Sequence, residues 1–134
     1  MGVKLAAWTT RTHTLIHVSV DRAGIAARLR GLLGGQDNPD LGDVAVRLGV
    51  EELSLRMSVD ELSPHPTVEV LAAGIRVYGV DPSWLLTGQY DAGIHRSVMD
   101  GDLDPAVSVR QFFYERKVRI SEPTRERFRF NDQN

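Results

Sequence analysis

The chain has 134 residues, 42% of them hydrophobic and 25% charged, which is enough to bury one core without disulfides or a metal. The absence of cysteine excludes a disulfide scaffold, a zinc ribbon and a thiol nucleophile. The formal net charge of −2 excludes a general polycation that coats nucleic acid. No apolar run has the length of a membrane span and no signal-peptide core is seen, so we expect a soluble, cytoplasmic protein.

The first twenty residues predict a short strand. Residues 12–20 are rich in β-branched side chains and partly alternate between apolar and polar types. Asp21 then has the side chain that favours an N-cap. We therefore assign residues 1–20 to an N-terminal strand or arm.

The middle part of the chain, residues 21–90, predicts a helical domain. Apolar side chains recur there at helical spacing in five short runs. The expected helices span residues 21–33, 41–48, 51–61, 67–78 and 82–87. Glycine follows four of them, as is common where a helix ends in a left-handed residue. Gly49 and Val50 leave only a very short turn between the second helix and the third.

Residues 91–134 predict a C-terminal extension that contains a β-hairpin. The runs 117–121 and 127–131 alternate between apolar and polar side chains, and a turn around Pro123 separates them. Residues 106–116 fit either a strand or a helix. Because an isolated hairpin is marginally stable, the strands should pair with residues 12–20 or with a second copy of the chain. We prefer a homodimer joined by strands.

Two motifs of the middle part point to a known family. The run from Tyr78 to Gly88 reads YGVDPSWLLTG, and Leu48-Gly49-Val50 stands between the second and third helices. Over residues 22–90 the chain resembles the phage-repressor-like helix-turn-helix family of the Cro/C1 or Xre type. The resemblance implies a mainly α fold: a five-helix lambda-repressor-like helix-turn-helix domain, here with short β-strand extensions at both termini.

The resemblance also implies a function. Members of this family are transcriptional regulators that act as homodimers on operator DNA, with the third helix in the major groove. Carried onto this sequence, the surface spans residues 40–65. Phosphate contacts are then expected from Arg22, Arg28, Arg47 and His65. Base contacts are expected from Ser54, Arg56 and Ser58, and Glu51 is a further expected DNA-binding residue.

The third helix is unusual for a DNA reader. Four of the residues from 51 to 61 are acidic and only Arg56 is basic, so the segment would be repelled by phosphates. Leu55 and Val59 share one face, and Leu53 and Met57 fall on another. Either the helix is rotated so that both pairs are core, or the second pair faces a partner. The alternative function is therefore a non-enzymatic protein-interaction module, such as an adaptor, anti-regulator or antitoxin-like protein.

The C-terminal part offers a rival surface for nucleic acid. Its arginines are interleaved with aromatic side chains, a combination that can follow a phosphate backbone and stack bases. We favour the simpler interpretation, in which the aromatic side chains face a core or partner and the arginines face water. A protein partner could bind at this hairpin or at the third helix.

The sequence predicts no enzyme, no cofactor and no metal site. His13 and His17 are two ligands without a third. Asp100, Asp102 and Asp104 have the spacing that begins an EF-hand loop, but Pro105 stands where the turn glycine belongs. No nucleophile elbow or phosphate-binding loop is present.

Overall fold

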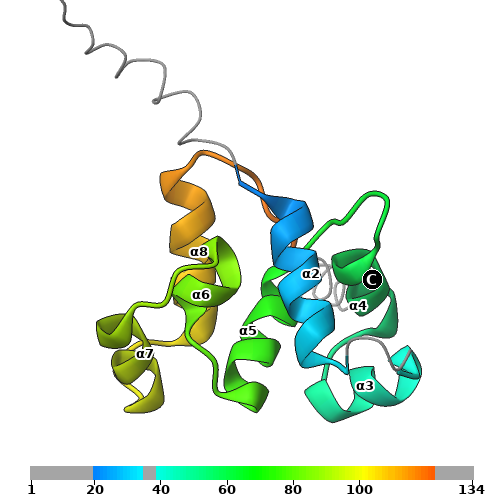
Figure 1. The fold of residues 1–134 in the computed structure, drawn as a ribbon, viewed down its shortest axis with the longest axis horizontal. Coiled ribbons are helices and arrows are strands. Elements are labelled where there is room, and N and C mark those ends of the chain that lie inside the picture. Colours follow the sequence, from blue (N-terminus) through cyan, green and yellow to red (C-terminus); the bar gives the residue numbers. More distant parts are fainter. Residues whose placement is uncertain (1–19, 35–38, 123–134) are drawn as a thin grey trace, which may run out of the picture.

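The computed structural model describes residues 20–34 and 39–122, and this part of the chain is mainly helical (Figure 1). Seven helices lie within the described residues: α2 (Arg22–Leu32), α3 (Leu41–Leu48), α4 (Glu52–Val59), α5 (Val68–Tyr78), α6 (Pro82–Thr87), α7 (Ala92–Met99) and α8 (Pro105–Glu115). None of these helices has the length and apolar character needed to cross a membrane.

Aspartate side chains set where most of these helices begin. Asp21, Asp40 and Asp81 each accept hydrogen bonds from backbone N–H groups in the first turn of the helix that follows. Those donors have no partner within a helix, so a side-chain acceptor at the N-cap fixes the start. Gly49, Gly79 and Gly88 lie past the ends of α3, α5 and α6 with positive φ. These starts and stops agree with the predicted helices to within a few residues.

Helix α5 occupies the centre of the core. It packs against α2, α3 and α4 on one side and against α8 on the other (Figure 1). Its residues from Val70 to Ile75 are all buried, so α5 is apolar around most of its circumference. Helices of six to eleven residues are unstable alone, so this shared core holds the bundle together.

Helices α7 and α8 continue the same bundle beyond residue 90. Val109 and Phe113 of α8 are fully buried and belong to one core cluster with α2, α4 and α5. Of the two structures expected for residues 106–116, the helix is therefore confirmed. Helix α7 was not predicted, and none of its residues is fully buried. The predicted boundary at residue 90 does not divide the core.

The predicted hairpin is not formed by the run 117–121. Val118 and Ile120 pack against the core, and Ser121 makes a single parallel bridge to Thr67 through a 3.0 Å hydrogen bond from the Val68 N–H to the Ser121 carbonyl. No β-strand occurs in residues 20–34 and 39–122. This run alternates because one side packs on helices, which corrects the strand prediction. The second run, 127–131, and the predicted strand at 12–20 lie outside the described residues.

An ion pair holds the end of the described chain. Arg110 of α8 donates from Nε and Nη2 to the two carboxylate oxygens of Glu122, at 2.9 and 3.0 Å. The hydrogen bond to Glu122 raises the pKa of Arg110 above its usual value, so the guanidinium stays charged. Residues 116–122 are thus tied to both α8 and the start of α5.

Candidate nucleic-acid interface

The turn between α3 and α4 has the geometry that the sequence predicts. Gly49 adopts φ 74° and ψ 34°, and its N–H donates to the carbonyls of Ala45 and Val46. Val50 and Glu51 then lead directly into α4. A residue with a side chain is strained in this left-handed conformation, so glycine allows the chain to turn sharply here. Two eight-residue helices are consequently joined by three residues.

Helix α4 has a buried face and an outward face. Leu55 and Val59 are buried, as predicted, whereas Leu53 is 58% exposed. Met57 is half-buried, and Glu52 and Arg56 are exposed. Of the two arrangements considered for this helix, the one that leaves Leu53 and Met57 on a second face is therefore closer to the structure. We define the α4 face as Glu52, Leu53, Arg56 and Met57.

Ser54 and Ser58 lie on the buried side of α4, with only 2% and 0% of their surfaces exposed. Ser58 Oγ donates to the Ser54 carbonyl at 2.8 Å and accepts the Thr67 N–H at 3.3 Å. Ser54 Oγ donates to Glu51 Oε1 at 3.5 Å. Because both serines are buried, they are not available for the base contacts predicted from the sequence: the Ser58 hydroxyl connects α4 to Thr67, and the Ser54 hydroxyl bonds to Glu51 at the start of α4.

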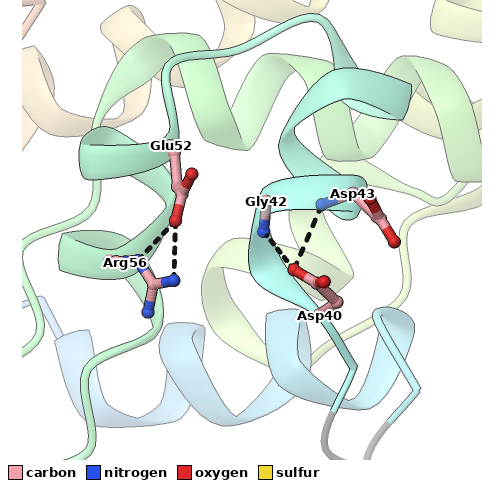
Figure 2. A network of polar contacts seen from close by, with 5 residues as sticks. All are labelled: Asp40, Gly42, Asp43, Glu52 and Arg56. Carbon is pink, nitrogen blue, oxygen red and sulfur yellow. Dashed lines mark hydrogen bonds and ion pairs between the residues drawn. The ribbon is translucent and has the colours of Figure 1, made fainter.

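Arg56 is on the outward side, but a carboxylate already binds it. Its Nε and Nη2 donate to Glu52 Oε2 at 2.9 and 2.6 Å, one helical turn away (Figure 2). Both side chains are about half exposed, so water competes for the pair and its contribution to stability is below about 1 kcal/mol. Arg56 can therefore exchange Glu52 for another acceptor at low cost.

The amino-terminal end of α3 faces the same acids. Asp40 Oδ1 accepts the N–H groups of Gly42 and Asp43 at 2.9 and 3.4 Å (Figure 2). Glu52 is also close, because a Cβ added at Gly42 would lie 3.3 Å from Glu52 Oε1. A helix N-terminus is a common place for a phosphate. Here the protein's own carboxylates surround that place.

The predicted phosphate contacts fall into two groups. Arg22 and Arg47 are exposed on α2 and α3, and His65 is exposed in the loop after α4. Arg28 is not available, because its Nε donates to the Leu85 carbonyl at 2.9 Å and its Nη2 atom is buried. The prediction for Arg28 is corrected accordingly: this side chain joins α2 to the end of α6. Glu51 is half-buried, and its N–H donates to Glu69 Oε2 at 3.4 Å.

Sequence reasoning missed Arg30, which fixes the carboxyl end of α4. Its Nη1 donates to the Val59 carbonyl at 2.7 Å. A cation at the end of a helix satisfies an unpaired carbonyl and complements the helix dipole. The basic residue in the last turn of α2 was visible in the sequence, but its contact with a residue 29 positions later depends on packing. Arg30 and Gly49 together set the orientation of α4.

Within residues 20–34 and 39–122 no three metal-ligating side chains come together. Asp104, which has the spacing of an EF-hand ligand, caps α8 by accepting the Ala106 N–H at 3.1 Å. No family model, curated protein or solved structure matches this chain.

Proposed function

We propose that the chain is a DNA-binding transcriptional regulator of the phage-repressor type. In this proposal residues 21–90 are a five-helix helix-turn-helix domain, and a homodimer places α4 of each copy in a major groove. The observation that carries the proposal is the α3–Gly49–α4 unit, in which a tight turn leaves one side of an eight-residue helix exposed. A cytoplasmic location would accompany this role.

The residues that we propose to contact bases differ from those expected from the sequence. With Ser54 and Ser58 buried, base contacts would come from the α4 face, where Arg56 can bind a guanine edge. Glu52 can accept from a cytosine amino group, and Leu53 and Met57 can contact thymine methyl groups. Exposed Arg22, Arg47 and His65 would contact phosphates. Glu51 stays a predicted contact at the start of α4.

The acidic residues around the start of α4 lead to a prediction that tests this proposal. Asp40, Asp43 and Glu52 would lie near the backbone of a bound duplex, and their charges would oppose binding. Glu52→Gln removes one of these charges and frees Arg56, and it keeps a carbonyl oxygen that can accept from a cytosine amino group. We expect it to tighten duplex binding at low salt.

To test the proposal, the purified full chain is mixed with a pool of random-sequence DNA duplexes at near-physiological salt, and the duplexes that bind are sequenced. The expected result is a two-fold-related motif with half-sites about 34–36 Å apart, which matches one helical turn between two copies of α4.

Arg56→Ala should then weaken the free energy of duplex binding by about 1–3 kcal/mol and relax the preference at one base position. Arg96→Ala, an exposed arginine on α7, is the matched control. A folded dimer that selects no motif would contradict the proposal.

A second candidate function is protein binding through the same unit. The observation that favours it is apolar exposure among acids: Leu53 is 58% and Leu62 95% exposed, next to Glu52 and Glu61. Such a surface suits a basic protein surface better than a duplex. If Leu53→Ser abolishes capture of a protein partner while duplex selection yields nothing, this second function holds instead of the first.

A further inference from the structure

We propose that residues 123–134 bind in cis to the acidic surface around α4 and thereby compete with its ligand. The docking itself stands on the charges and contacts below, and its regulatory consequence rests on the proposed function. The surface consists of the α4 face with the neighbouring acids Asp40 and Asp43 and the loop residues Asp60, Glu61 and Leu62.

This surface combines negative charge with exposed apolar side chains. Between residues 39 and 63 the chain carries six acidic side chains against Arg47 and Arg56. The net charge of this stretch is therefore −4, and one of its two cations, Arg56, already binds Glu52. Leu62 is almost fully exposed, and the Asp60 carboxylate holds its loop by accepting the Leu62 and Ser63 N–H groups at 3.1 and 2.7 Å. The occupant should therefore be basic and carry apolar side chains.

The segment 123–134 is weakly basic, with three arginines against Glu126 and Asp132, and it carries two phenylalanines. Its run from residue 125 to 130 reads RERFRF, so three arginines alternate with one glutamate and two phenylalanines. In an extended segment Phe128 and Phe130 would project to one side, because side chains alternate along such a chain. Phenylalanine side chains could cover Leu53 and Leu62 while Arg125, Arg127 and Arg129 approach the acids.

The last described residues lie where this segment needs to start. Ser121 is bridged to Thr67, and Thr67 follows directly on the loop that carries Glu61 and Leu62. The Thr67 N–H in turn donates to Ser58 Oγ of α4. Arg110 of α8 binds Glu122, so residues 121 and 122 are both held in place before the segment 123–134 begins. Four extended residues span about 13 Å, so Arg125 can reach up to about that distance from Ser121.

The first experiment measures docking without any ligand. Amide spectra of the ¹⁵N-labelled full chain are compared with those of a chain ending at Glu122, and a synthetic peptide of residues 123–134 is then added to the shorter chain. We expect the peptide to shift the amides of α4 and of residues 60–63 toward their positions in the full chain. Salt at about 1 M should remove the effect, because the Debye length falls to about 3 Å.

Two matched variants make the result specific. Leu53→Ser on the α4 face should abolish the peptide shifts, whereas Tyr114→Ser, a similarly exposed apolar position on α8, should leave them unchanged. Unchanged α4 amides, or shifts confined to α7 and α8, would overturn the proposal. Shifts in the full chain that grow with protein concentration would also overturn it, because they would show docking between copies.

The second experiment measures competition with the duplex selected above. A short tether gives an effective concentration of about 1 mM, so a docking Kd of about 0.1 mM implies about tenfold tighter duplex binding after truncation. Peptide shifts on α4 with no duplex binding by either chain would support docking and contradict the proposed function. Duplex binding that truncation does not change, with no α4 shifts, would contradict docking and leave the proposed function standing.

Discussion

Ser58 shows how one hydroxyl can be mistaken for a ligand contact. In the sequence it stands on the helix that resembles a DNA reader, with the small polar side chain that such readers often use. In the structure its hydroxyl connects two segments: it donates within α4 and accepts the N–H of Thr67, at the start of α5. Sequence spacing alone could not decide which side of this short helix is buried, because apolar residues occur on two of its faces.

Replacement of Ser58 by alanine should therefore affect stability. Ser58→Ala removes the hydroxyl that accepts the buried Thr67 N–H, and an unsatisfied buried donor costs about 1–3 kcal/mol. Urea unfolding followed by circular dichroism measures the change. Ser63→Ala, in the exposed loop after α4, is the control and should change stability little. Equal stabilities of the two variants would contradict the assigned role of Ser58.

At the scale of the elements, the capping residues that begin and end helices were easier to predict from the sequence than contacts between helices. Asp40, Asp81, Gly49 and Gly88 could be placed from sequence because each acts on its own helix. Helix α7 escaped prediction because its large apolar residues, Ile94, Val98 and Met99, give only a weak helical pattern over eight residues, although Asp91 is a good N-cap and accepts the Ile94 N–H. A strand was predicted at 117–121 because apolar and polar side chains alternate there. The same alternation occurs in a single extended segment that packs one side against helices.

The turn between α3 and α4 gives a prediction with an internal control. No atom lies within 4 Å of a Cβ added at Gly49 or at Gly31, so only backbone conformation distinguishes the two positions. Gly49→Ala places a side chain at positive φ and should lower the free energy of unfolding by about 1–2 kcal/mol. Gly31→Ala lies in helical α2 and should raise it by about 0.5–1 kcal/mol. Thermal unfolding of both variants measures these opposite signs.

At the scale of the whole molecule, helices on both sides of residue 90 share one hydrophobic core. The sequence suggested a five-helix domain with a separate extension, since the family resemblance ends near residue 90. Phe113 and Val109 instead complete the core that α5 shares with α2 and α4. This could not be read from α8 alone, because an amphipathic helix does not reveal in its sequence which partner it covers.

Phe113→Ala should consequently weaken the entire bundle. Removal of a fully buried phenylalanine costs about 3–5 kcal/mol through lost burial and the cavity that remains. Amide hydrogen exchange should show lower protection in α3 and α4 as well as in α8. Tyr114→Ala, at the exposed neighbouring position, serves as the reference. Loss of protection limited to α7 and α8 would instead indicate a separately folding extension.

The position of α8 against α5 has a consequence for synthesis of the chain. Ribosomes add about 5–20 residues per second, so several seconds separate completion of α5 at Tyr78 from completion of α8 at Glu115. During that interval the apolar side of α5 that receives Phe113 has no cover. Nascent chains should therefore bind chaperones until α8 emerges, and stable folding should begin only once residues 105–115 have left the ribosome.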